Sequence, residues 1–212
     1  MNVPVIVLGG GGHAKVVIEA LHRSNHSIIG FTTPDFEDFN QQILGIKRLG
    51  TDEEILKIDP KEVKLVNGIG SIGFPEIRKN IFLNYKERGY DFINVVHPSV
   101  ILPRDFNLSE GAQLMAGVVV QPGCHLGNNT ILNTRACVDH DCLIGNNVHI
   151  ASGAIICGDV KIADNVHVGA GSTVIQGISI GKNSIIGAGS VVIRDVPEDV
   201  TVIGVPAKEV QR

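Results

Sequence analysis

The stretch "ILNTRACVDHDCLIGNNVHI", residues 131–150, decides the fold because its aliphatic residues recur at every sixth position. Leu132, Val138, Ile144 and Ile150 follow one another at this interval. A six-residue period fits neither the turn of an α-helix nor the alternation of a flat strand. It is typical of a chain that turns a corner after each short strand and directs one aliphatic side chain inward per side.

The same period continues without a break over a much longer part of the chain. Seventeen positions in steps of six are all Val, Leu or Ile: Val96, Leu102, Leu108, Leu114, Val120, Leu126, Leu132, Val138, Ile144, Ile150, Ile156, Ile162, Val168, Val174, Ile180, Ile186 and Val192. Three such hexads make one coil, so the pattern predicts about five to six coils of parallel strands. We therefore expect residues 96–212 to form a left-handed parallel β-helix of hexapeptide repeats.

The preceding part, residues 1–95, instead alternates between strand and helix patterns. The expected strands are "VIVL" (5–8), "SIIGF" (27–31) and "VKLVNGIGS" (63–71), and the expected helices are residues 14–22, "TDEEILKI" (51–58) and "PEIRKNIFLNYKERG" (75–89). Thr51 and Glu54 have the spacing of a capping box at the start of the second helix. The alternation predicts an α/β, Rossmann-like βαβ domain with a parallel sheet.

Composition limits the classes of partner. The chain carries 18 Lys and Arg against 22 Asp and Glu, a net charge of −4, and has no basic block. A nucleic-acid partner is not expected, because phosphate backbones require a positive protein surface. The N-terminus shows no cationic leader and no apolar run reaches membrane length, so we expect a cytoplasmic protein without a membrane span.

The glycine loop after the first strand indicates a phosphate site. Gly9, Gly11 and Ala14 satisfy the relaxed dinucleotide fingerprint, so an NAD-dependent dehydrogenase is one alternative. Backbone N–H groups at a helix start suit two phosphates, whatever is attached to them. The loop therefore predicts a diphosphate ligand without identifying it.

The cysteines and histidines of the repeat raise the question of a metal site. "CVDHDC" (137–142) is a possible ligand cluster, but Cys124 and Cys142 are 18 positions apart and should stack inside the coil. Cys137 and Cys157 fall in other columns, so no tetrahedral set forms within one chain. The zinc-dependent β-helix carbonic anhydrases pair two histidines five apart, whereas His140 and His149 are nine apart. We expect no metal.

One histidine has the surroundings of a general base. His140 is flanked by Asp139 and Asp141, and carboxylates can hold an imidazole in one tautomer and raise its proton affinity. The alternative is that the triplet is only a polar corner of the coil. His149 and His167 are 18 positions apart and should stack on one edge of the prism.

The sequence closely resembles the bacterial nucleotide-sugar N-acetyltransferases that acylate 4-amino-4,6-dideoxy sugars. Relatives in this group include UDP-bacillosamine-pathway and GDP-perosamine enzymes and the sialic acid O-acetyltransferases. The resemblance covers essentially the whole chain and rests on "GGGGHAKVVIEAL" (9–21), "ILNTRACVDHDCLIG" (131–145) and "GVPAK" (204–208). It implies direct transfer of acetyl from acetyl-CoA to a sugar 4-amino group, with UDP favoured over GDP, in a homotrimer whose sites lie between subunits.

The resemblance also assigns roles to individual residues. His140 would be the general base, Asp141 would polarise it, and Asn133 would orient the sugar near C4. On the acetyl-CoA side, His149 would bond the thioester region and help polarise its carbonyl, and the implied contacts with the rest of the molecule are Ala170, Ala188 and Lys208. On the sugar-nucleotide side the implied contacts are Gly11, Gly12 and His13 with the diphosphate, Thr32, Thr33 and Asp35 with the base and ribose, and Gly70 and Ser71 with the sugar.

Two further alternatives for the function remain open at this point. In a sugar O-acetyltransferase of the sialic-acid type, the same His140 would activate a hydroxyl group instead of an amine. A non-enzymatic binding or scaffold protein would keep the β-helix without its catalysis.

Overall fold

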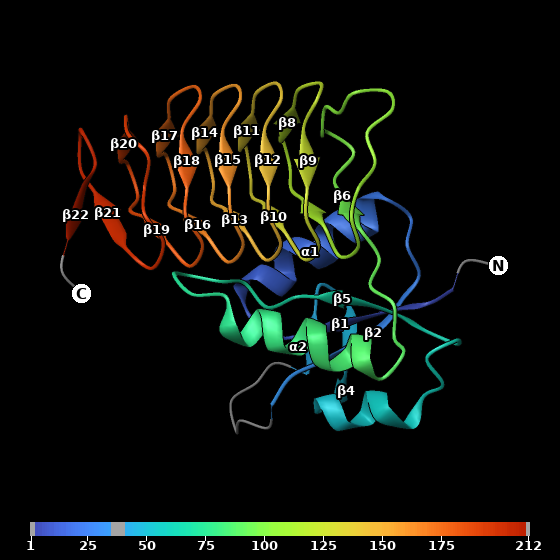
Figure 1. Ribbon diagram of the computed structural model, residues 1–212. Helices are drawn as coiled ribbons and strands as arrows, with labels where there is room; N and C mark the ends of the chain where they lie inside the picture. Colours follow the sequence, from blue (N-terminus) through green and yellow to red (C-terminus); the bar gives the residue numbers. More distant parts are fainter. Residues whose placement is uncertain (1–2, 35–40, 211–212) are drawn as a thin grey trace.

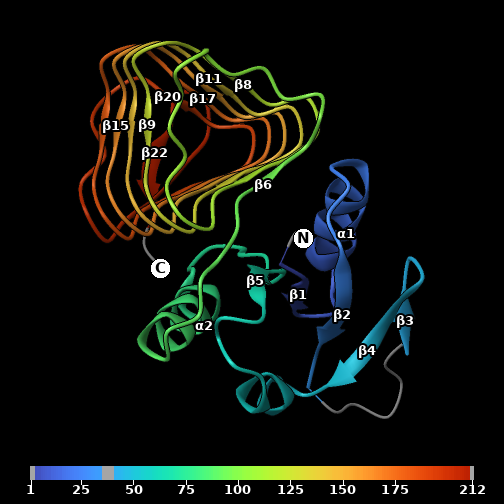
Figure 2. The same cartoon turned by 90° about the vertical axis from the view of Figure 1, so that its right-hand side faces the viewer.

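The computed structural model describes residues 3–34 and 41–210, and two parts of the chain lie side by side in it (Figure 1). An N-terminal α/β unit packs against one side of a stack of coils. Seen from a second direction, the coils form a triangular prism (Figure 2). No helix in these residues is long and apolar enough to cross a membrane.

The α/β unit is a five-stranded sheet in the order β3-β4-β2-β1-β5. Its elements are β1 (Val5–Leu8), α1 (Gly12–Arg23), β2 (Ile28–Thr32), β3 (Gln42–Ile43), β4 (Ile46–Gly50), the 3-10 helix η1 (Asp52–Lys57), β5 (Lys64–Asn67) and α2 (Glu76–Glu87). The four buried residues of β1 pair in parallel with β2 on one side and β5 on the other. The loops that follow β1 and β5 therefore leave the sheet at the same edge.

The structure differs from the sequence prediction in two places in this unit. Residues 52–57 form a 3-10 segment rather than an α-helix, and the Thr51 side chain makes no capping bond. Asp52 is instead tied to the surrounding fold, since its carboxylate accepts from Thr32 (2.5 Å) and its carbonyl from Tyr85 (2.9 Å). The hairpin β3–β4 was not predicted, because β4 buries none of its residues and shows no apolar alternation.

The prism has three faces, each a parallel sheet, apart from the antiparallel β21–β22 pair. The docked face, against which the α/β unit packs, holds β6 (Val95–Val96), β7 (Gln113–Leu114), β10 (Ile131–Leu132), β13 (His149–Ile150), β16 (His167–Val168), β19 (Ile185–Ile186), β21 (Thr201–Ile203) and β22 (Lys208–Val210). The open face holds β8 (Val119–Val120), β11 (Cys137–Val138), β14 (Ile155–Ile156), β17 (Thr173–Val174) and β20 (Val191–Val192). The third face holds β9 (His125–Leu126), β12 (Leu143–Ile144), β15 (Lys161–Ile162) and β18 (Ser179–Ile180).

The six-residue ladder forms the core of the prism. Strands pair so that each residue lies beside the one 18 positions later, as with Ile131 and His149. Every ladder residue from Leu114 to Val192 is buried, with 0–3% of its surface exposed. One aliphatic side chain per strand therefore fills the interior, as the period predicted.

Asparagines line the corner between the third face and the docked face. Asn129, Asn147, Asn165 and Asn183 are all left-handed, with φ between 55° and 61°. Each side-chain amide donates to the next coil, at 3.0, 3.2 and 2.9 Å, and Asn183 donates to Asp199 at 2.8 Å. Asparagine is among the few residues that tolerate this backbone conformation, and it adds a bond along the prism axis.

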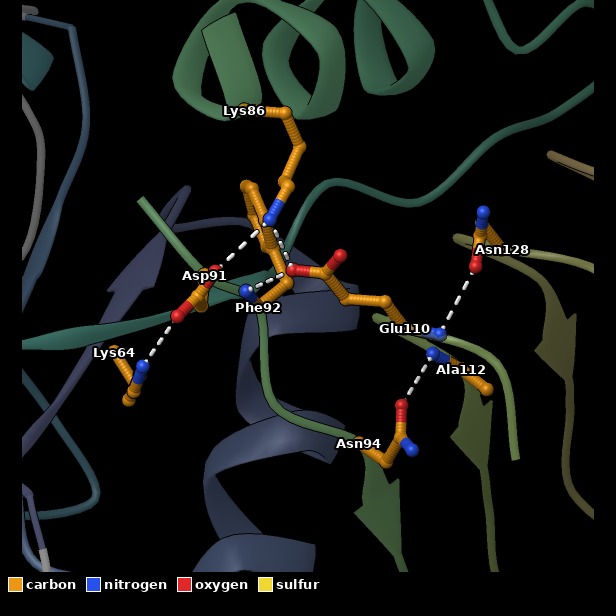
Figure 3. Close-up of polar contacts among 8 residues, drawn as sticks. All are labelled: Lys64, Lys86, Asp91, Phe92, Asn94, Glu110, Ala112 and Asn128. Carbon is orange, nitrogen blue, oxygen red and sulfur yellow. Dashed lines mark hydrogen bonds and ion pairs between the residues drawn. The ribbon is translucent and has the colours of Figure 1, made fainter. Parts of the chain in front are cut away.

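A polar cluster attaches the α/β unit to the first coils (Figure 3). Lys86 on α2 lies 2.7 Å from Glu110 and 3.0 Å from Asp91, and Glu110 also accepts the backbone N–H of Phe92. The connection between the two parts is thus held by both charge pairs and backbone hydrogen bonds. Since the side chains are about one-third exposed or more, we ascribe to each pair about 0–1 kcal/mol.

The asparagine corner gives a test of stability. Asn147→Gly removes the amide contacts but keeps a backbone free to be left-handed, so we expect a loss of about 1 kcal/mol in the free energy of unfolding. Asn147→Ala also forces a β-carbon into the left-handed region and should cost about 1–2 kcal/mol more. Urea unfolding measures both, and equal stability of the two variants would contradict this account.

Candidate functional site

Two cavities meet where the α/β unit touches the docked face. The interdomain cleft, about 630 Å³, brings together the predicted residues Gly11, Gly12, His13, Gly70, Ser71, Asn133 and His149. The corner groove, about 530 Å³, runs along the corner between the docked and open faces and contains Ala170 and Ala188. Both cavities share Ser71, Ile72, Asn133, His149 and Ser152, so they form one continuous depression.

The glycines after β1 leave the start of α1 open to a ligand. Gly11 is the N-cap of α1 and no side chain caps the helix. A β-carbon at Gly11 or Gly12 would meet no other atom within 4 Å, so the backbone faces open space there. Gly9 has another role, because its φ is 105° and a β-carbon would lie 2.5 Å from Ile69. The loop thus offers helix N-terminal N–H groups to an anion.

His13 lies in the wall of the cleft as a neutral side chain. Its Nε2–H donates to Oε1 of Gln113 (2.7 Å), whose amide in turn donates to the carbonyl of Asn67 (2.7 Å). Burial, followed by the charge of Arg78, lowers the pKa of His13 to about 4. With Nε2–H donating to Gln113, Nδ1 is the ring nitrogen that remains for a ligand.

Arg78 holds the loop after β5. Arg78 is 2% exposed, and its Nη1 donates to the carbonyls of Asn67 (2.8 Å) and Ile69 (2.6 Å). The side chain of Asn67 returns a bond to the carbonyl of Arg78 (2.9 Å). These bonds fix the segment that carries Gly70 and Ser71 into the cleft.

The tautomer of His149 is set by this loop. Nδ1 lies 2.6 Å from the carbonyl oxygen of Ser71, which only accepts, so Nδ1 carries the proton. Nε2 then accepts from the amide of Asn133 (3.3 Å). Burial, and secondarily His167, lowers the pKa of His149 to about 3. The neutral ring therefore offers an acceptor at Nε2, which does not suit the predicted role of polarising a thioester carbonyl.

Stacked columns build the corner groove. His149 and His167 meet edge to face with ring centroids 5.0 Å apart, on the docked face rather than at an edge of the prism. Ala170 and Ala188 are exposed and continue the column of Thr134 and Ser152, each 18 positions apart. Thr134 and Ser152 were not predicted as site residues, although they lie at steps of 18 positions before Ala170.

His140 and Asp141 form a hydrogen-bonded pair at the corner between the open and third faces. His140 Nδ1 lies 2.8 Å from Asp141 Oδ2, whereas Asp139 accepts the backbone N–H of His140 (2.9 Å). The bond to Asp141 raises the pKa of His140 above its ordinary value. The structure thus assigns Asp141, of the two flanking acids, as the imidazole's partner.

The comparisons with known proteins agree with this architecture. Residues 4–85 match the PglD N-terminal domain, and residues 141–176 and 159–194 match the bacterial transferase hexapeptide (six repeats). PerB from Caulobacter crescentus, solved with CoA and GDP-perosamine, is 34% identical (TM-score 0.89), covering 98% of this chain and 97% of PerB. The acetyltransferase domain of PglB from Neisseria gonorrhoeae, solved with acetyl coenzyme A, is 30% identical (TM-score 0.90), covering 99% and 100%.

The chain belongs to the nucleotide-sugar N-acetyltransferases of the hexapeptide-repeat family. It is therefore a CoA-dependent acetyltransferase, and the predicted Rossmann-like unit followed by a left-handed β-helix is confirmed. The fingerprint of Gly9, Gly11 and Ala14 is not that of a dehydrogenase.

Several residues predicted for this acetyltransferase lie away from both cavities. Thr32 and Thr33 are buried, 0% and 2% exposed, and the Thr32 hydroxyl is bonded to Asp52, so neither side chain reaches the cleft. Lys208 is exposed on β22 and lines neither cavity. Asp35 lies outside the described residues.

The part of the acetyltransferase that the structure describes holds no group of three or more His, Cys, Asp or Glu side chains able to bind a metal ion. Cys142 is buried within the coil, and its Sγ donates to the carbonyl of Cys157 (3.1 Å). The cysteines of "CVDHDC" thus pack in or on the coil without converging.

The tautomer of His149 can be measured directly. We expect ¹⁵N NMR to show a neutral ring with Nδ1 protonated over about pH 5 to 8, because burial keeps it uncharged. Ser71→Ala keeps the carbonyl and should leave the tautomer unchanged. Titration of His149 within this range, or protonation at Nε2, would contradict the assignment.

Proposed function

We propose that this acetyltransferase transfers acetyl from acetyl-CoA to the 4-amino group of a nucleotide-linked 4-amino-4,6-dideoxy sugar. The observation that carries the proposal is the meeting of the interdomain cleft and the corner groove at Asn133 and His149. UDP is the expected nucleotide and GDP the second candidate. The expected product is the N-acetylated sugar nucleotide.

The interdomain cleft suits the acceptor. Its floor is the open helix start at Gly11 and Gly12, where backbone N–H groups would bind the diphosphate. Gly70 and Ser71 would pass beside the sugar, with Asn133 facing it from the coil. PerB, which was solved with GDP-perosamine, supports a 4-amino sugar nucleotide as the ligand class.

The corner groove suits the acetyl donor. Ala170 and Ala188 are small and exposed, so an extended thiol arm would be able to approach the backbone closely. PerB and the PglB domain, solved with CoA and acetyl coenzyme A, support acetyl-CoA as the donor. Because Lys208 lines neither cavity, it would contact acetyl-CoA only through a part of the molecule that extends beyond the groove.

His140 is proposed as the general base. Its Nε2 would take a proton from the 4-amino group as the nitrogen attacks the thioester carbonyl, while Asp141 holds Nδ1–H and stabilises the imidazolium. A C–N bond forms, the C–S bond breaks, and the proton on His140 can pass to the departing thiolate. No covalent acyl-enzyme is required, so no cysteine acts as a nucleophile.

A homotrimer would unite the parts of this site. Within one chain His140 stands at one border of the open face, while Asn133 and the groove stand at the other border. The open face itself is apolar, with Ile155, Ile175 and Ile193 exposed by 46%, 39% and 42%. If copies of the chain pack through this face around a threefold axis, the His140 corner of one copy lies beside the groove of the next.

The reaction class is tested by thiol release with UDP- and GDP-linked 4-amino-4,6-dideoxy sugars and with CMP-sialic acid. We expect turnover of an amino sugar, and a loss of about 10²–10⁴-fold in kcat for His140→Ala because the general base is missing. Turnover of CMP-sialic acid alone would replace the proposal by sugar O-acetylation. Full activity of His140→Ala would refute the mechanism.

The shared site is tested by co-expressing two inactive variants. His140→Ala removes the base, and Ala170→Tyr fills the groove at an exposed position. Random assembly should restore about one quarter of the wild-type activity, because each site draws one corner from each of two copies. As the control, the two variants are purified separately, mixed, and assayed immediately, before their subunits can exchange. Co-expressed protein that stays as inactive as its parents would show that each site lies within one chain.

A further inference from the structure

Two glycines from adjacent coils enclose the His140–Asp141 pair. A β-carbon at Gly158 would lie 2.6 Å from both Cε1 and Nε2 of the His140 ring. A β-carbon at Gly123 would overlap Oδ1 of Asp141. The imidazole and the carboxylate therefore each rest directly on a backbone that has no side chain.

The backbone at Gly158 does not itself demand glycine. Its φ is outside the left-handed region, unlike that of many corner glycines. The 18-residue register places Pro122, His140, Gly158 and Gln176 in one column, so the neighbouring coils carry side chains at this position. The missing side chain at Gly158 is thus explained by the ring that occupies its space.

The corner backbone keeps the pair from moving away. The N–H of Asp141 donates to the carbonyl of Pro122 (3.0 Å), and the carbonyl of His140 accepts from Asp159 (2.9 Å). Asp141 is left-handed, with φ of 61°, and its carboxylate reaches back to the ring. With both backbones fixed, any added side chain at Gly123 or Gly158 must displace the carboxylate or the ring.

We propose that Gly123 and Gly158 are positioning residues that seat the His140–Asp141 pair for proton transfer. The inference rests on the proposed role of His140 as general base. A misplaced base loses much of its effect, since an error of about 1 Å can cost roughly 10²-fold in rate.

The acid limb of the pH–rate profile measures whether His140 keeps its hydrogen bond to Asp141, because that bond raises the pKa of His140. The groups that raise the pKa of His140 are Asp141, through the hydrogen bond, then the charges of Asp139, Asp141 and Cys124. The base works only when neutral, so activity falls as the pH drops through this raised pKa. Lengthening the bond to Asp141 lowers the pKa towards about 6.5 and moves the limb to lower pH.

The test compares Gly158→Ala and Gly123→Asn with a matched control in the wild-type background. Asparagine tolerates the left-handed φ of 81° at Gly123. Gly177→Asn adds the same side chain at another left-handed glycine, φ 76°, where no atom lies within 4 Å of the new β-carbon. Asp141→Asn is the reference variant: it shows at which pH the acid limb of the pH–rate profile lies when the carboxylate is absent.

For Gly158→Ala and Gly123→Asn we expect kcat to fall by roughly tenfold to a hundredfold, with the KM for acetyl-CoA near the wild-type value. The acid limb should shift towards that of Asp141→Asn, and the NMR pKa of His140 should fall in parallel. Gly177→Asn should keep both the limb and the pKa. A wild-type kcat together with a wild-type His140 pKa in Gly158→Ala and Gly123→Asn would overturn the proposal.

The two proposals fail in different ways. The NMR pKa of His140 is measured without any reaction, so it tests the seating even if His140 is not the base. If the pKa shifts while His140→Ala retains activity, the general-base mechanism fails and the seating stands. Circular dichroism and unfolding of each variant confirm that the coil is intact.

Discussion

The 18-residue register of the coil is the constraint on which the rest of the molecule depends. Parallel hydrogen bonds and the buried aliphatic ladder place each residue beside the one a full coil away. Side chains are consequently arranged in columns: one column of the docked face runs through Gln113, Ile131, His149 and His167. The α/β unit packs against this column, and the loops after β1 and β5 form the opposite wall of the interdomain cleft.

Burial separates the histidines of the site into two kinds. His13 and His149 are enclosed where the two parts meet, and burial keeps both uncharged with their protons committed to Gln113 and Ser71. His140 stands exposed at a corner beside Asp141, where its proton affinity is raised. The surroundings alone therefore make His13 and His149 neutral hydrogen-bonding groups and give His140 a raised proton affinity.

The repeat was predictable from sequence because each inward position depends only on its own coil, and the pairing of His149 with His167 followed from the same spacing. The resemblance predicted that Gly11, Gly12 and Ser71 belong to one binding site, and the structure gathers them in one cleft, but their contacts with a ligand stay a prediction. The tautomer of His149 was not predictable, since a carbonyl 78 positions away decides it. The hydrogen bond from the Thr32 hydroxyl to Asp52 joins residues 20 positions apart, and no local pattern predicts it.

The loop after β5 has a consequence for binding energetics. Ser71 and Ile72 line both cavities, and the carbonyl of Ser71 holds His149 between them. A ligand that shifts this loop changes the free energy of binding in both cavities at once. By thermodynamic reciprocity, each substrate then alters the affinity for the other by the same factor. If donor and acceptor occupy the two cavities as proposed, the loop that lines both cavities would link the two binding events.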